Sequence, residues 1–105
     1  MSDYVIVLTT LGVDADAEAL ARTLVEERLA ACVNLLPEMT SVYRWDGGVQ
    51  QDRERQLVVK TAALRLDALR ERLLALHPYQ VPEFLVLEVA GGSEAYLGWV
   101  RDATS

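Results

Sequence analysis

Cysteine, histidine and lysine are almost missing from this chain of 105 residues, which contains one of each: Cys32, His77 and Lys60. A single cysteine cannot form an internal disulfide bond, and a histidine 45 positions later in the chain does not give the close spacing of a zinc site. The motif G-x-S-x-G and the phosphate-binding Walker sequence are absent as well. The sequence therefore gives no support to nucleophilic catalysis, a phosphate loop or a cysteine–histidine metal centre.

Positive charge is also scarce, because 10 Lys and Arg residues stand against 16 Asp and Glu residues and leave a net charge of −6. A nucleic-acid surface needs a clustered positive field, so we expect no nucleic-acid partner. No apolar run approaches the length of a membrane span, and the start Met1-Ser2-Asp3-Tyr4 lacks the positive region and cleavage site of a signal peptide. We expect a cytoplasmic protein without a membrane partner, folded as a single domain over residues 1–105.

The most organised stretch is Ala31–Thr61, in which two extended segments are joined at Asp46-Gly47-Gly48. A short connection built on Asp-Gly favours a β-hairpin, because the turns that match strand twist need positive φ angles. The first arm, Cys32–Trp45, would extend about 46 Å at roughly 3.3 Å per residue, whereas a compact domain of this length is about 33 Å across. The ribbon is longer than its own domain, so its tip, with Tyr43 and Trp45, is expected to contact another chain.

Apolar periodicity places the other elements around this ribbon. They are a strand over Tyr4–Leu8 covered on both faces, a helix capped by Asp14 that runs to about Ala30, a helix over Leu64–Leu76 without a clear cap, a strand over Phe84–Ala90 and a helix capped by Ser93. Pro37 interrupts the first arm of the ribbon, which suits an edge strand or a bulge. The sequence therefore predicts the α+β class, as a ferredoxin-like β-α-β-β-α-β sandwich with a long β-hairpin and a C-terminal helix. Two right-handed β-α-β units put both main helices on one face of a four-stranded antiparallel sheet.

The segment from His77 to Glu83 carries two prolines, an imidazole, a phenol (Tyr79) and a carboxylate. His77 and Glu83 are nitrogen and oxygen ligands of the kind that copper or zinc accepts. The alternative is structural: His77 ends a helix and its ring meets the free carbonyls there, while the prolines fix the route into the last strand. The structural interpretation is preferred, since two ligands are fewer than the usual three or four.

Cys32 and Lys60 are the other unusual residues. Cys32 has apolar neighbours and is expected to be a small core residue, with a role as a soft ligand as the alternative. Lys60 would bind an anion, pair with a carboxylate such as Glu54, or simply reach solvent. Because Glu54 and Lys60 lie about 20 Å apart on one strand at roughly 3.3 Å per residue, they can pair only between chains.

A family resemblance rests on motifs spread over nearly the whole chain. They are Ala30-Ala31-Cys32-Val33-Asn34, Pro37, Ser41-Val42-Tyr43-Arg44-Trp45-Asp46-Gly47, Glu54, Lys60-Thr61, His77-Pro78-Tyr79-Gln80-Val81-Pro82-Glu83 and Tyr96-Leu97-Gly98-Trp99. In order and spacing the chain resembles the CutA divalent-cation tolerance proteins. The resemblance implies a ferredoxin-like fold, a trimeric PII-like assembly built through long ribbons, and a role in tolerance of copper and other divalent cations.

The resemblance also carries over a metal site, in which His77 and Glu83 match the histidine and glutamate after the second helix of the family. Some members have a further histidine just before this one and a cysteine near the end of the first strand. Leu76 and Thr9 occupy those places here. No cofactor is certain on these grounds, and copper or another divalent cation is the one that the resemblance implies.

Three functions are therefore weighed. The first is a non-enzymatic homotrimer in the response to divalent metal ions, with weak copper binding. The second is a PII-like trimeric sensor that binds a small anionic ligand in inter-subunit clefts formed by Lys60, Tyr43 and Tyr79. The third is an enzyme of unknown chemistry, for which only His77 titrates naturally near neutral pH. Cys32, Trp45 and Glu54 complete the set of residues expected at the clefts or interfaces.

Overall fold

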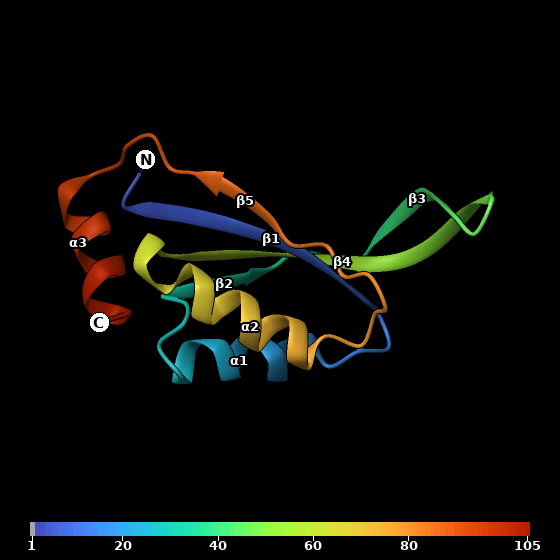
Figure 1. Ribbon diagram of the computed structural model, residues 1–105, viewed down its shortest axis with the longest axis horizontal. Helices are drawn as coiled ribbons and strands as arrows, with labels where there is room; N and C mark the ends of the chain where they lie inside the picture. The colour runs from blue at the N-terminus through green and yellow to red at the C-terminus, as the bar shows by residue number, and fades with distance from the viewer. Residues whose placement is uncertain (1) are drawn as a thin grey trace.

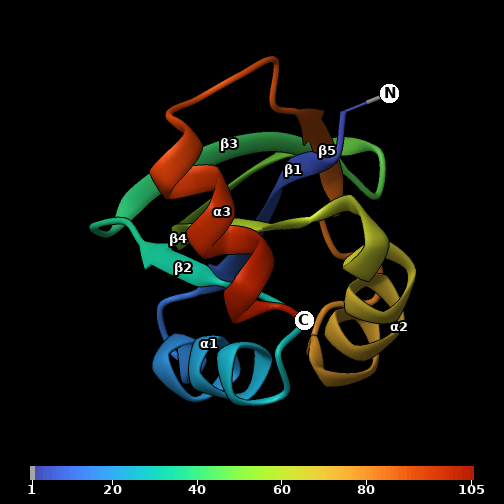
Figure 2. The same cartoon turned by 90° about the vertical axis from the view of Figure 1, so that its left-hand side faces the viewer.

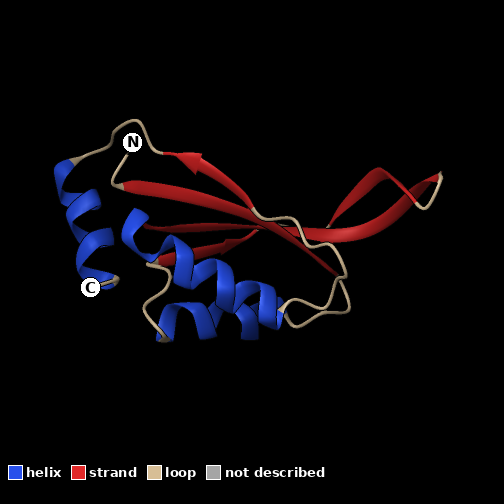
Figure 3. Ribbon diagram, in the orientation of Figure 1, coloured by secondary structure: helices blue, strands red, loops and turns tan. Residues whose placement is uncertain are grey.

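The computed structural model describes residues 2–105 and shows an α+β fold (Figures 1 and 3). Its elements are β1 (Tyr4–Gly12), α1 (Ala17–Glu26), β2 (Cys32–Leu35), β3 (Met39–Trp45), β4 (Gly48–Ala62), a 3₁₀ turn η1 (Ala63–Arg65), α2 (Leu66–Leu76), β5 (Leu85–Glu88) and α3 (Glu94–Ala103). The strands form one antiparallel sheet in the order β2-β4-β1-β5, with β3 as a second partner of β4. The predicted β-α-β-β-α-β order and the appended helix are confirmed.

The long strand β4 organises the sheet, because two strands share one of its edges. Its inner half pairs with β2, where Cys32 is opposite Lys60, and its outer half pairs with β3, where Trp45 is opposite Gly48. The first arm of the ribbon is thus two strands rather than one, and Pro37 lies in the interruption between them. Proline has no N–H to donate to a ladder, which accounts for the break.

The ribbon turns through Asp46 and Gly47, whose φ angles are 51° and 76°. Two consecutive residues with positive φ are the signature of the tight hairpin turn that matches strand twist. The Asp-Gly prediction is therefore confirmed at this turn. The ribbon projects beyond the rest of the molecule (Figure 3), which measures 45 × 26 × 24 Å along its principal axes.

The hydrophobic core lies between the sheet and the two main helices, which cover the same face (Figure 2). Alternate residues of the central strands point into it, and Val7, Leu57 and Val59 are fully buried. Leu24 from α1 and Leu73 from α2 meet them, also without exposed surface. Since strand side chains alternate between faces, the other face of the sheet carries intermediate and exposed residues, apart from the buried Glu54 and Ala62 of β4.

That uncovered face corrects the prediction for the first strand. The strand runs to Gly12 and not only to Leu8, and only one of its faces is buried in the chain. The last strand is also shorter than predicted: β5 covers Leu85–Glu88, and all of its residues are exposed. A run of apolar residues indicates that a strand is buried, but it does not show whether the residues that bury it belong to the same chain or to another one.

The first helix begins and ends at other residues than predicted. Its cap is Asp16, whose Oδ1 accepts from the N–H of Ala19 at 3.0 Å. Asp14 instead lies within a turn closed by the hydrogen bond from Ala15 N–H to the carbonyl of Gly12. The helix ends at Glu26, because Arg28 has a φ angle of 60° and the chain leaves the helical path well before Ala30.

The second and third helices follow the predictions more closely. α2 has no side-chain cap, follows the short turn η1, and ends where His77 adopts an extended conformation before Pro78. α3 is capped by Ser93, whose hydroxyl accepts from the N–H of Tyr96. No helix in the described residues is long and apolar enough to cross a membrane.

Candidate functional site

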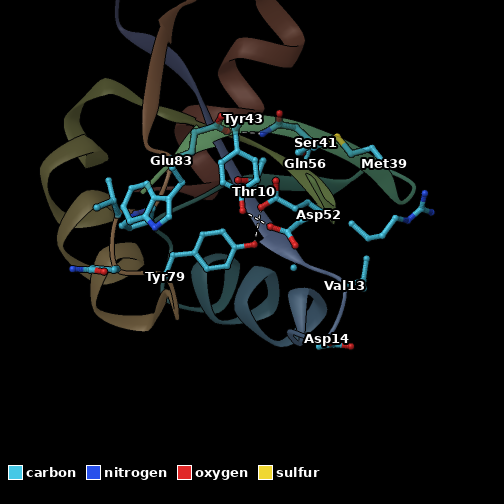
Figure 4. Close-up of a pocket in the computed structure, with 17 residues that line it drawn as sticks. Thr10, Val13, Asp14, Met39, Ser41, Tyr43, Asp52, Gln56, Tyr79 and Glu83 are labelled. Atoms are coloured by element: carbon cyan, nitrogen blue, oxygen red, sulfur yellow. Dashed lines mark hydrogen bonds between the residues drawn. The ribbon is translucent and has the colours of Figure 1, made fainter. Parts of the chain in front are cut away.

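The candidate site is a pocket of about 910 Å³ along one face of the ribbon, from the end of β1 and the loop between α2 and β5 out to Trp45 beside the turn. Its floor is formed by side chains that share one face of β4, the face opposite to Leu57 and Val59. β3 supplies one wall, and the loop residues 79–83 supply another. Figure 4 shows the labelled side chains of both walls gathered around the same opening.

Two phenol–carboxylate pairs form the centre of the pocket (Figure 4). The hydroxyl of Tyr79 donates to Oε2 of Glu54 at 2.6 Å, and the hydroxyl of Tyr43 donates to Oδ2 of Asp52. Glu54 is 7% exposed, so its carboxylate is largely withdrawn from water. The pair Tyr79–Glu54 also ties the loop after α2 to β4.

Both phenols are held in the protonated state. Burial raises the pKa of Tyr79 far above its usual value of 10.0, and the hydrogen bond to Glu54 and the charges of Glu54 and Asp52 raise it further. The pKa of Tyr43 is raised chiefly by its hydrogen bond to Asp52. Each phenol thus remains a donor to a carboxylate at any pH near neutrality.

The His77 side chain lies behind the pocket and connects β1 to the loop after α2. Its ring Nε2 lies 2.8 Å from the carbonyl oxygen of Thr10, and its Nδ1 accepts from the backbone N–H of Tyr79 at 3.1 Å. A ring whose Nδ1 accepts must carry its proton on Nε2, which then donates to Thr10. The ring is 8% exposed and contacts the Tyr79 ring edge-on at 4.8 Å between centroids. Its partners are strand and loop, and not the helix carbonyls expected from the sequence.

This geometry bears on the predicted metal ligands. Both ring nitrogens of His77 are engaged, so neither presents a free lone pair to a metal ion. Oε2 of Glu83 accepts from Gln56 at 2.8 Å, and the same amide also donates to the carbonyl of Thr9. Within residues 2–105 no group of three or more His, Cys, Asp or Glu side chains is placed to hold a metal ion. In this conformation one chain does not fit a copper or zinc centre, and the pair His77 and Glu83 stays a prediction.

The structure separates the residues expected at the clefts into two places. Tyr43, Trp45, Glu54 and Tyr79 line the pocket, together with Glu83. Cys32 and Lys60 lie opposite each other at the far end of the sheet, where Lys60 Nζ is 5.9 Å from the centre of the Tyr96 ring. The anion-binding set of Lys60, Tyr43 and Tyr79 is therefore not assembled within one chain.

Sequence reasoning missed Asp52 and Gln56, which belong to the same pocket. The spacing of Asp52, Glu54 and Gln56 by two residues puts all three on one face of a strand, which is a signal that the sequence does contain. Thr10 and Gly12, at the end of β1, were missed because the first strand was expected to end at Leu8.

Comparison with known proteins gives the family. The family described as CutA1 divalent ion tolerance protein matches residues 5–103. The chain belongs to this family. A divalent-cation tolerance protein CutA of Thermus thermophilus is 50% identical over 99 residues, which are 94% of this chain and 96% of the relative.

Solved structures of the family agree with the fold. The divalent cation tolerance protein of Thermus thermophilus has a TM-score of 0.92 at 48% identity, covering 97% of this chain and 99% of that chain. CutA from the bacterium Xylella fastidiosa has a TM-score of 0.94 at 41% identity, covering 99% of this chain and 100% of that chain. The family resemblance and the fold class predicted from the sequence are confirmed.

Proposed function

We propose that this chain works as a non-enzymatic homotrimer in the response to divalent metal ions, copper among them. The observation that carries the proposal is the apolar surface that one chain leaves bare. On the ribbon, Val42 is 65% exposed and Val49 is 67% exposed, and on β5 Leu85 is 53% exposed. Apolar surface gathered on strands supports contact with further copies of the chain. The family name, divalent ion tolerance, supports the metal response.

We expect metal binding by this protein to be weak and unselective. A single chain offers His77 and Glu83, and both are engaged in hydrogen bonds. Sites shared between chains would add oxygen ligands but no thiolate unless Cys32 takes part, and soft ligands are what select copper. Affinities in the micromolar range or weaker follow from this ligand set.

Two measurements test the proposal. Sedimentation equilibrium at micromolar concentration should give the mass of a trimer, and a monomer would contradict the assembly.

Calorimetric titration with copper and zinc chlorides should give weak binding that His77→Ala reduces. Asp67→Asn removes a fully exposed carboxylate on α2 and serves as the control. Nanomolar copper affinity, or copper binding that His77→Ala leaves intact, would contradict the expected site.

A further inference from the structure

The ribbon formed by β3 and β4 has two chemically different faces. Successive side chains of a strand alternate between faces, and residues directly opposite each other in an antiparallel pair share a face. On the ribbon Ser41 is opposite Asp52, whereas Arg44 is opposite Val49. The face that lines the pocket, here called the acidic face, carries Tyr43, Trp45, Asp52 and Glu54. The reverse face, here called the arginine face, carries Val42, Arg44, Val49 and Arg53.

The acidic face is concave, because residues 79–83 of the loop form a second wall of the pocket (Figure 4). The phenol of Tyr43 donates to Oδ2 of Asp52, and Oδ1 of that carboxylate makes no hydrogen bond within the described residues. The phenol keeps its proton, so it orients the acid without neutralising its charge. The rings of Tyr43 and Trp45 are 40% and 46% exposed. This face therefore offers an oriented carboxylate beside open aromatic rings.

The arginine face carries a guanidinium group without a counter-charge. Arg44 is exposed and forms no salt bridge within residues 2–105. Arg53, on the same face, is instead engaged by Glu38 at 3.3 Å. The neighbours of Arg44 on this face are Val42 and Val49, whose apolar side chains are largely exposed. This face therefore presents one unpaired positive charge beside uncovered apolar surface.

The two faces complement each other in charge and in shape of contact. A guanidinium binds a carboxylate through two parallel N–H bonds and also stacks on aromatic rings, which lysine does less well. Valine side chains gain contact by packing against such rings. Within one chain the ribbon itself keeps Arg44 and Asp52 apart, since they lie on opposite faces. A contact between them must therefore join two copies of the chain.

We propose that the arginine face of one copy packs in the pocket of a second copy, where the Arg44 guanidinium binds Asp52 and stacks on Tyr43 and Trp45. The inference rests on the proposed homotrimer and names a contact that holds its ribbons together. A contact between two different surfaces is heterologous, and such contacts form a ring when the rotation between copies closes. A ring of three copies uses each pocket and each arginine face once, so that every pocket is completed by a residue of its neighbour.

The test is sedimentation equilibrium of the full chain with charge-reversal variants. Arg44→Glu and Asp52→Arg should each raise the concentration at which half of the trimer dissociates by at least about tenfold. The double variant exchanges the two charges and should recover most of that loss, because the two residues meet across the contact. Arg22→Glu makes the same change on an exposed arginine of α1 and should leave assembly unchanged.

The outcomes separate this inference from the functions proposed above. Trimers of unchanged stability in both single variants would overturn the inference and leave the homotrimer intact. Losses that the double variant does not recover would overturn the contact between Arg44 and Asp52. An original chain that sediments as a monomer would contradict the homotrimer itself, and this inference with it. The measurements are made in EDTA with His77 and Glu83 unchanged, so they do not depend on the proposed metal site.

Cross-linking locates the contact even if a charge reversal disturbs the ribbon. Arg44→Lys keeps the positive charge and supplies an amine, which a carbodiimide joins to a carboxylate as an amide while taking up the released water as a urea. We expect linked dimers and trimers on denaturing gels, with the peptide of residue 44 bonded to the peptide of residue 52 in mass spectra. The original chain has no amine at this position and serves as the control. Bonds from residue 44 to other carboxylates alone would overturn the contact.

Discussion

The two halves of β4 differ in both their strand partners and their burial. The inner half is paired on both edges, with β1 and β2, and its Leu57 and Val59 have no exposed surface. The outer half, beyond the end of β1 at Gly12, is paired with β3 alone, and its Val49 is 67% exposed. The inner half is stabilised by the hydrophobic core. The outer half is stabilised only by the hairpin turn and by its hydrogen bonds to β3. A two-stranded ribbon is marginal by itself in water, so the outer half depends on what covers it.

The largest effect should come from the inner half. Leu57→Ala removes a fully buried side chain between the helices and the sheet. Substitutions of this kind lower the free energy of unfolding by about 3 kcal/mol, since they leave a cavity. Urea denaturation should show this loss. Val49→Ala, on the same strand and of the same chemical kind, is the control and should cost far less in the isolated chain. Equal losses of unfolding free energy at Leu57 and Val49 would show that the two halves of β4 contribute equally to stability.

The next effect should come from the ribbon and should depend on assembly. Val42→Asp places a carboxylate at an apolar position of the ribbon that is 65% exposed in one chain and where we expect another chain to pack. Burying that charge at a contact costs about 2 kcal/mol or more, so mass and melting temperature should fall together. Leu64→Asp makes the same change in η1, where Leu64 is 98% exposed, and should alter neither. If the mass of the Val42→Asp assembly in solution is unchanged, another chain does not pack on this part of the ribbon.

A smaller effect concerns the pocket between the two halves and appears only at alkaline pH. The pKa of Tyr79 is raised in the folded chain, whereas in the unfolded chain it has its usual value near 10.0. The folded chain therefore keeps a proton that the unfolded chain releases, and the stability is complete below about pH 9 and decreases as the pH rises through 10. Melting temperatures from pH 8 to 11 should fall less steeply for Tyr79→Phe than for the original chain. Parallel curves would show that this phenol does not contribute.

The smallest effect should come from Lys60, at the inner end of β4. Its ammonium group lies 5.9 Å from the ring of Tyr96 on α3. A cation–π contact of this kind at a partly exposed site contributes about 0.5 kcal/mol. Lys60→Met keeps the aliphatic stem and should shift the melting temperature by only a few degrees at most. A collapse of the assembly in this variant would instead show that Lys60 has a counter-charge on a neighbouring chain.

Local signals predicted the fold well where one residue type decides the backbone. Asp46-Gly47 fixed the turn, Pro37 marked the break in the first arm, and Pro78 ended α2. Helix α1 was harder, because Asp14 and Asp16 are equally good caps by residue type. Only the turn hydrogen bond of Ala15 to Gly12 decides between them, and this bond depends on where the neighbouring strand ends.

The candidate site was predicted in part. Tyr43, Glu54 and Tyr79 were singled out as cleft residues, and the structure brings them together. Their neighbour Asp52 was missed, because a carboxylate on a ribbon is ordinarily just a solvated side chain. His77 ends α2 as expected, but its ring bonds to the carbonyl of Thr10 on β1 and to the N–H of Tyr79, and not to the helix carbonyls. The partner on β1 lies far away in sequence and cannot be read from spacing alone.

The arrangement of β4 also has a consequence for the order in which the chain folds. On the ribbon Trp45 pairs with Gly48, whereas in the body Tyr4 pairs with Ala62. Hairpins close in about 1–10 μs, while contacts across a long loop must first overcome its closure entropy. The ribbon can therefore form before the core that anchors it. During that interval the apolar side chains and the unpaired strand edges of the ribbon are exposed to solvent. When many copies are synthesised at once, ribbons of different chains can pair with each other before folding is complete.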